Sequence, residues 1–97
     1  MNYLKKYNLT TEDIDQIKKH FNKDIINKFE VMEYNVTTIL DYLNTFNITL
    51  FKDLILNRPD VCFMNLEVLK EKTSKIDPNL IKFIFEKEVN NLMNFDI

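Results

Sequence analysis

Apolar residues recur along most of the chain at the three- and four-residue spacing of an amphipathic helix. The clearest stripe consists of Val36, Ile39, Leu40, Leu43 and Phe46. Shorter stripes of the same kind are Ile14, Ile17 and Phe21, then Ile25, Ile26, Phe29 and Met32, and then Leu50, Phe51, Leu54 and Ile55. The pattern predicts an all-α fold, in which residues 1–97 form one compact bundle of five or six short helices around a single core.

Polar residues mark where several of these helices should begin. Thr10 or Thr11 can cap a first helix, and Asp13 stands three residues after Thr10, which is the spacing of a capping box. Asn65 stands immediately before another apolar stripe. Asp77 followed by Pro78 combines a cap with a proline at the first helical position. Each of these signals is local, so each predicts a helix start without knowledge of the fold.

In the middle of the chain, the sequence marks the helix boundaries less directly. We expect Asn35 to cap the helix of the main stripe and Thr49 to begin a short helix with Leu50 facing inward. That helix should end before Pro59, because the residue preceding a proline is pushed out of the helical region. Residues 22–34 fit a helix, although Val31 would also permit a strand.

The chain contains no glycine. P-loops, dinucleotide-binding turns and EF-hands need glycine at fixed places, so these sites are disfavoured. Asparagine instead stands where a preceding helix needs a left-handed residue, in Tyr7-Asn8-Leu9-Thr10 and in Phe46-Asn47-Ile48-Thr49. The two stretches share the order aromatic, asparagine, aliphatic, threonine. We interpret this echo as internal repetition of a helical unit.

A proline register gives part of the chain a likeness to a known family. Counting from Pro59, apolar residues fall three, ten and seventeen positions on, at Cys62, Leu69 and Ile76. With this register, residues 35–76 resemble one complete repeat of the mitochondrial transcription termination factor family, whose turn usually carries glycine where Asn47 stands here. The resemblance implies a helical scaffold with repeat-like, solenoid-type packing and, in the family, nucleic-acid binding along a basic concave face.

The charge balance argues against that implied function. The net charge is −2 and no third of the chain is basic, whereas nucleic-acid binders gain much of their affinity by neutralising phosphates. The candidate nucleic-acid residues are Arg58, Lys70, Lys72 and Lys75, of which only Arg58 offers a bidentate fork. The lysines are also explained by the helix dipole and by a pair with Glu71. Nucleic-acid binding is therefore the alternative function.

No set of residues in the sequence predicts catalysis. His20 is the only histidine, and Asp24 one turn later could orient its imidazole, but no nucleophile accompanies the pair. Cys62, the only cysteine, has apolar neighbours, which favours burial over reactivity. One histidine and one cysteine do not make a zinc site. We expect a non-enzymatic protein without a cofactor or a metal.

The last helix, expected from about Asn79 to Leu92, is apolar around most of its circumference. Such a helix is either buried between others or uses part of its surface to contact another chain. The candidate interface residues are Phe83, Phe85, Leu92 and Phe95, which would contact a protein partner or a second copy.

The leading prediction is a small protein-binding module, such as an adaptor or an inhibitory regulator, that acts through an apolar helical surface. The single Cys62 fits a reducing compartment. No signal-peptide pattern and no membrane-length apolar run occur in the sequence, so we expect a cytoplasmic location and no membrane partner.

Overall fold

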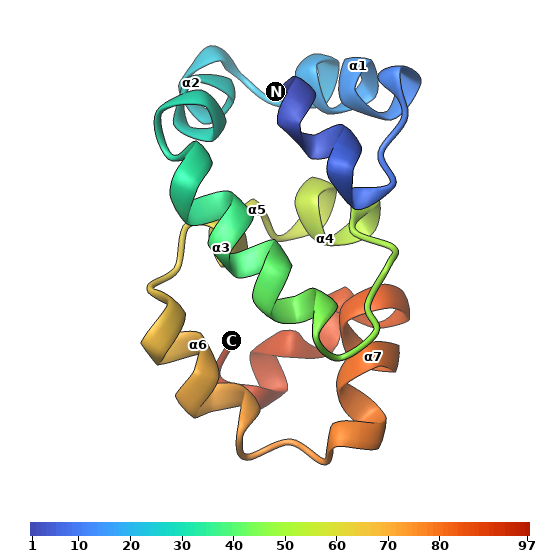
Figure 1. The fold of residues 1–97 in the computed structure, drawn as a ribbon, viewed down its shortest axis with the longest axis vertical. Coiled ribbons are helices and arrows are strands. Elements are labelled where there is room, and N and C mark those ends of the chain that lie inside the picture. The colour runs from blue at the N-terminus through green and yellow to red at the C-terminus, as the bar shows by residue number, and fades with distance from the viewer.

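The structure, a computed structural model, describes all of residues 1–97. It contains seven α-helices, two 3-10 helices and no strand, which confirms the all-α prediction (Figure 1). In chain order the elements are η1 (Asn2–Tyr7), α1 (Thr11–His20), α2 (Lys23–Val31), α3 (Glu33–Asn44), α4 (Lys52–Asn57), α5 (Pro59–Cys62), α6 (Leu66–Thr73), α7 (Pro78–Lys87) and η2 (Val89–Phe95).

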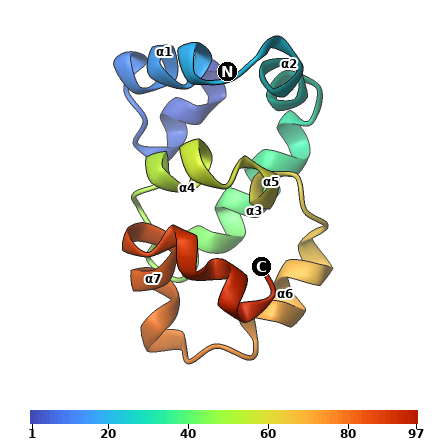
Figure 2. The same ribbon diagram turned by 180° about the vertical axis from the view of Figure 1, so that it is seen from behind.

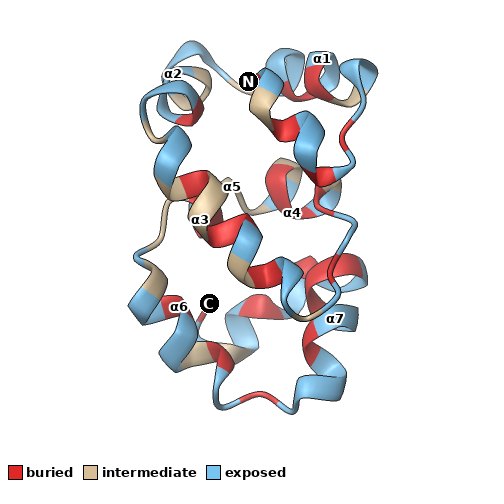
Figure 3. Ribbon diagram, viewed as in Figure 1, coloured by how far each residue is buried: buried red, intermediate tan, exposed pale blue.

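The long helix α3 crosses the middle of the molecule, and the other helices lie around it. Helices α1 and α2 lie at one end, and α6 and α7 lie at the other (Figures 1 and 2). The molecule measures 34 × 22 × 21 Å. Its buried hydrophobic residues form one cluster of 25, and the buried positions lie on the inward faces of the helices (Figure 3). One core therefore serves the whole chain.

The local start signals are confirmed. The Asp13 N–H donates to Thr10 Oγ1 at 3.1 Å and the Thr10 N–H donates to Asp13 Oδ2 at 2.9 Å, so the capping box of α1 is complete. Asn65 caps α6, and Asp77 caps α7 with Pro78 at the first position. Because the side chain and the amides it serves are neighbours in sequence, these starts depend little on the rest of the fold.

Within residues 22–34, Lys23–Val31 form α2 and Glu33 begins α3, so the strand interpretation is wrong. The Ile25 N–H donates to Asn22 Oδ1 at 3.1 Å, which starts α2. Val31, the residue that would also have permitted a strand, is 85% exposed at the end of this helix. Phe29 is the fully buried residue of α2 and fixes the helix to the core.

Two predicted starts are wrong. Helix α3 begins at Glu33, and Asn35 lies inside its first turn, where its side-chain amide donates to the carbonyls of Cys62 and Met64 at 3.0 and 2.9 Å. Helix α4 begins at Lys52 instead of Thr49. In both cases the polar group bonds to a partner far along the chain and does not form a local cap. The Asn35 side chain bonds to the segment of Cys62 and Met64, and the Thr49 amide bonds to Glu86.

The expected last helix of residues 79–92 is also wrong in length. Helix α7 ends at Lys87, Glu88 has φ −129° and ψ 46°, and the chain continues as the 3-10 helix η2. Residues three apart share one face of a 3-10 helix. This change of geometry places Val89, Leu92 and Phe95 on the same side, with Val89 and Leu92 buried.

The two asparagine turns are confirmed as left-handed. Asn8 has φ 66° and Asn47 has φ 62°, a region in which asparagine is the best substitute for glycine. The aliphatic residues that follow, Leu9 and Ile48, are both buried. Each turn thus ends one helical segment and returns the chain directly to the core.

None of the helices has the combination of length and hydropathy that crossing a membrane requires.

Candidate functional site

Helix α7 presents an exposed apolar face. Its Ile81, Ile84 and Phe85 are buried, whereas Leu80 is 49% exposed and Phe83 is 53% exposed. Leu80 and Phe83 are three positions apart, so they are neighbours on the helix surface. We call these two residues the α7 face.

The structure separates the four residues predicted for an interface. Phe85 and Leu92 are fully buried, and Phe95 is half-buried against the core. A partner cannot contact Phe85 or Leu92 in this fold, because both side chains are buried. Phe83 is accessible, and Leu80 is exposed beside it on the helix surface. The three-residue spacing of this pair was visible in the sequence, but which face pointed outward was not.

Lys87 lies on the same side of α7, four positions after Phe83. It makes no ion pair within the fold, whereas Lys82 donates to the Asn47 carbonyl at 2.6 Å and lies 3.4 Å from the Glu86 carboxylate. The α7 face therefore has one unpaired cation at its C-terminal end.

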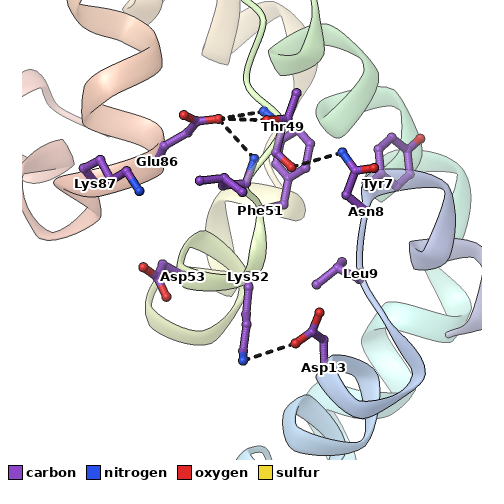
Figure 4. Close-up of a pocket in the computed structure, with 11 residues that line it drawn as sticks. Tyr7, Asn8, Leu9, Asp13, Thr49, Phe51, Lys52, Asp53, Glu86 and Lys87 are labelled. Carbon is purple, nitrogen blue, oxygen red and sulfur yellow. Dashed lines mark hydrogen bonds and ion pairs between the residues drawn. The ribbon is translucent and has the colours of Figure 1, made fainter.

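Glu86 holds α7 in place. Its side chain is nearly inaccessible, and its Oε2 accepts hydrogen bonds from the backbone N–H groups of Thr49 and Leu50 at 2.7 and 3.1 Å (Figure 4). Burial alone would raise the pKa of Glu86, but these two amides and Lys82 lower it below its usual value. The carboxylate is therefore charged at neutral pH and joins α7 to the segment before α4.

A small polar cavity of about 240 Å³ lies beside this joint. Its wall comes from the Asn8 turn, the start of α4 and the end of α7, and the Lys52 ammonium crosses it to Asp13 at 3.2 Å (Figure 4). The cavity is smaller than the roughly 300–1,000 Å³ typical of small-molecule sites. We interpret it as part of the joint between the three segments.

Arg58, the main candidate for nucleic-acid contact, is occupied within the fold. Its Nε and Nη2 donate to the two carboxylate oxygens of Asp60 at 3.0 and 2.9 Å, and Nη2 also donates to the Ile97 carbonyl. Only 21% of its side chain is exposed. The guanidinium N–H groups that would recognise a phosphate or a guanine are thus already hydrogen-bonded within the fold.

The three candidate lysines are also engaged. Lys70 lies 3.7 Å from Glu67, Lys75 lies 4.0 Å from Glu71, and Lys72 donates to the Asp96 carbonyl. Pairs on the surface of one helix are weak and exchange with water. They nevertheless place a carboxylate beside two of the three cations, so this end of the molecule does not form an uninterrupted basic strip.

The remaining candidates for chemistry lie apart from one another. His20 is exposed and contacts the ring of Phe21 at 4.8 Å between centroids, and the structure contains no bond between His20 and Asp24. Cys62 is fully buried, and burial raises the pKa of its thiol to about 12. No group of three or more His, Cys, Asp and Glu side chains is arranged to hold a metal ion.

Comparisons with protein-family models, with curated protein sequences and with solved structures find no match. The family likeness of residues 35–76 stays a prediction. The inference of function therefore rests on the α7 face and its surroundings.

Proposed function

We propose that this chain is a small non-enzymatic protein-binding module whose docking surface is the α7 face. The observation that carries the proposal is that Leu80 and Phe83, two large apolar side chains, are half-exposed one turn apart on the same helix. Apolar anchors at this spacing are how an amphipathic helix enters a groove of a partner. Aromatic side chains at the centre of such contacts supply most of the binding energy.

The surroundings of the α7 face indicate the chemistry of the partner. Lys87 is unpaired at one end of the face, so a partner surface with an apolar pocket and a carboxylate at its rim would complement it. Glu86 anchors the helix to the Thr49 segment, so the face needs no ordering when it binds. A preorganised helix loses little conformational entropy on association, which suits an adaptor or an inhibitory regulator.

Repeat-like packing of residues 35–76 belongs to this proposal. It is supported by the left-handed turn at Asn47, by Pro59 at the first position of α5 and by the contacts of α3 with both α5 and α6. The nucleic-acid alternative has less support, since Arg58 is bound to Asp60.

The proposal is tested in two steps. A photo-crosslinking amino acid at position 83 should capture a protein that mass spectrometry identifies, or a second copy of the chain. The affinity of the purified pair is then measured with Phe83→Ala, for which we expect a loss of about 10-fold or more. Val31→Ala is the control, because Val31 is even more exposed but belongs to α2, which lies at the opposite end of the molecule from α7.

Equal losses for the two variants would contradict the α7 face as the docking surface. A monomer in sedimentation together with no specific crosslink at position 83 would contradict protein binding there. Binding to DNA or RNA that weakens steeply with added salt would instead support the nucleic-acid alternative.

A further inference from the structure

A second cavity, of about 390 Å³, lies between α2 and the segment 59–64. It is lined by Ile25, Lys28, Pro59, Asp60, Phe63 and Met64. Its volume falls within the range of small-molecule sites, in contrast to the cavity beside Glu86. It is also independent of the α7 face, since α2 and α7 lie at opposite ends of the molecule (Figure 1).

One wall of this cavity is rigid before any ligand arrives. The Asn35 side chain holds the carbonyls of Cys62 and Met64 at 3.0 and 2.9 Å. The Phe63 ring packs edge-to-face on the fully buried Phe29, with 4.9 Å between the centroids. The backbone of this segment and the Phe63 ring are therefore held by contacts within the fold, which lowers the ordering cost of binding a ligand.

Of the two charged residues in the lining, Asp60 has an ion-pair partner and Lys28 has none. Both carboxylate oxygens of Asp60 accept hydrogen bonds from Arg58, so this anion is already neutralised. Lys28 has no ion-pair partner, and its Nζ lies 4.8 Å from the centroid of the Phe63 ring. A cation–π contact positions an ammonium group without removing its charge. The cavity thus combines an apolar wall with one available cation.

We propose that this cavity binds a small amphiphilic carboxylate, a compact aromatic or branched aliphatic body that carries one carboxylate group. The body packs against Ile25, Phe63 and Met64, and the carboxylate accepts a hydrogen bond from Lys28 Nζ. Charge-assisted hydrogen bonds of this type are about twice as strong as neutral ones. The cation therefore selects an acid over the alcohol of the same shape.

The experiment uses 4-phenylbutyrate as the probe and 4-phenylbutan-1-ol as its uncharged analogue. Binding is followed by NMR through the methyl signals of Ile25 and Met64. We expect the acid to shift these signals and to bind about 10-fold more tightly than the alcohol. Lys28→Gln should remove that preference, whereas Lys18→Gln, which changes the net charge equally at an exposed position on α1 outside the cavity, should keep it.

A third variant, Ile25→Phe, fills the cavity without changing its charge and should weaken both probes. Circular dichroism establishes that each variant is folded, and Lys28 is exposed, so its replacement should not disturb the core. The proposal is overturned if the acid causes no shift up to about 10 mM, if acid and alcohol bind equally, or if Lys28→Gln and Lys18→Gln have the same effect.

Discussion

The carboxylate of Glu86 on α7 accepts a 2.7 Å hydrogen bond from the backbone N–H of Thr49, which lies 37 residues earlier in the chain. The same oxygen accepts from the Leu50 N–H at 3.1 Å. No other side chain of α7 satisfies two backbone amides of another segment. This contact fixes the orientation of the helix that carries the α7 face.

We predict that Glu86→Gln lowers the free energy of unfolding by about 2 kcal/mol, because hydrogen bonds to a charged, nearly inaccessible acceptor contribute more than neutral ones. Glu71→Gln is the control, since Glu71 is exposed and its ion pair with Lys75 is long, at 4.0 Å. Urea denaturation at pH 7 measures both variants. Equal effects would show that the Glu86 contact contributes no more than a surface ion pair.

The same contact predicts a pH dependence. The pKa of Glu86 is lowered from its ordinary value of 4.5 in the folded protein, so its contribution to stability is complete above about pH 4.5. As the pH falls further, the unfolded chain takes up the proton first, and the contribution is lost through the lower pKa of the folded state. The stability difference between the natural protein and Glu86→Gln should therefore shrink from pH 5 to pH 2.

Urea titrations at several pH values measure this difference. Asp13 and Asp60 also have a lowered pKa, through hydrogen bonds from the Thr10 amide and the Arg58 side chain respectively. Both proteins contain these two groups, so their effect cancels in the comparison. A difference that stays constant throughout the range would contradict the assignment to Glu86.

The parts of the fold that could be predicted are those decided by neighbours in sequence. The capping box of Thr10 and Asp13 and the start at Asp77 join groups two or three positions apart. Asn35 and Thr49 have the same cap-forming chemistry, but their partners lie 27 to 37 residues away. Residue type alone does not distinguish a local cap from a long-range donor.

Asn35 offers a direct test of this distinction. As a donor to two carbonyls, it should be replaceable neither by alanine nor by aspartate, because both lack the amide N–H groups. We predict a loss of about 2 kcal/mol for Asn35→Ala and at least as much for Asn35→Asp. Asn57→Ala is the control, since the Asn57 amide bonds to Asp53 O at an exposed site.

Thermal or urea unfolding measures these variants. Aspartate is among the best N-cap residues, so a cap at position 35 would tolerate Asn35→Asp. Unchanged stability of Asn35→Asp would therefore restore the capping role and contradict the long-range one.

The turn at Asn47 gives a prediction about backbone conformation. Asn47 has φ 62°, so Asn47→Gly should keep the free energy of unfolding within about 0.5 kcal/mol, whereas Asn47→Ala should lower it by about 1 kcal/mol. Asn27→Ala in the exposed middle of α2 should not destabilise, because alanine is favoured there. Denaturant titrations compare the three, and a more stable Asn47→Ala protein would exclude backbone strain as the determinant.

The candidate site was harder to predict than the fold. The sequence of α7 is apolar around most of the helix circumference and therefore gives no sign of which apolar residues face the core. The change to 3-10 geometry after Glu88 also alters the direction of every later side chain, including Leu92. The α7 face points outward because Ile81, Ile84 and Phe85 pack into the core and Glu86 bonds to the Thr49 segment, and the sequence does not reveal these long-range contacts.

Phe83 and Phe85 provide the last test, since they are two positions apart and differ completely in burial. Phe85→Ala removes a fully buried ring and should lower the free energy of unfolding by about 4 kcal/mol. Phe83→Ala should change it by less than about 1 kcal/mol, because Phe83 is half-exposed. Urea denaturation of both variants measures the contrast. A large loss for Phe83→Ala would place that ring in the core, and it would then be unavailable to a partner.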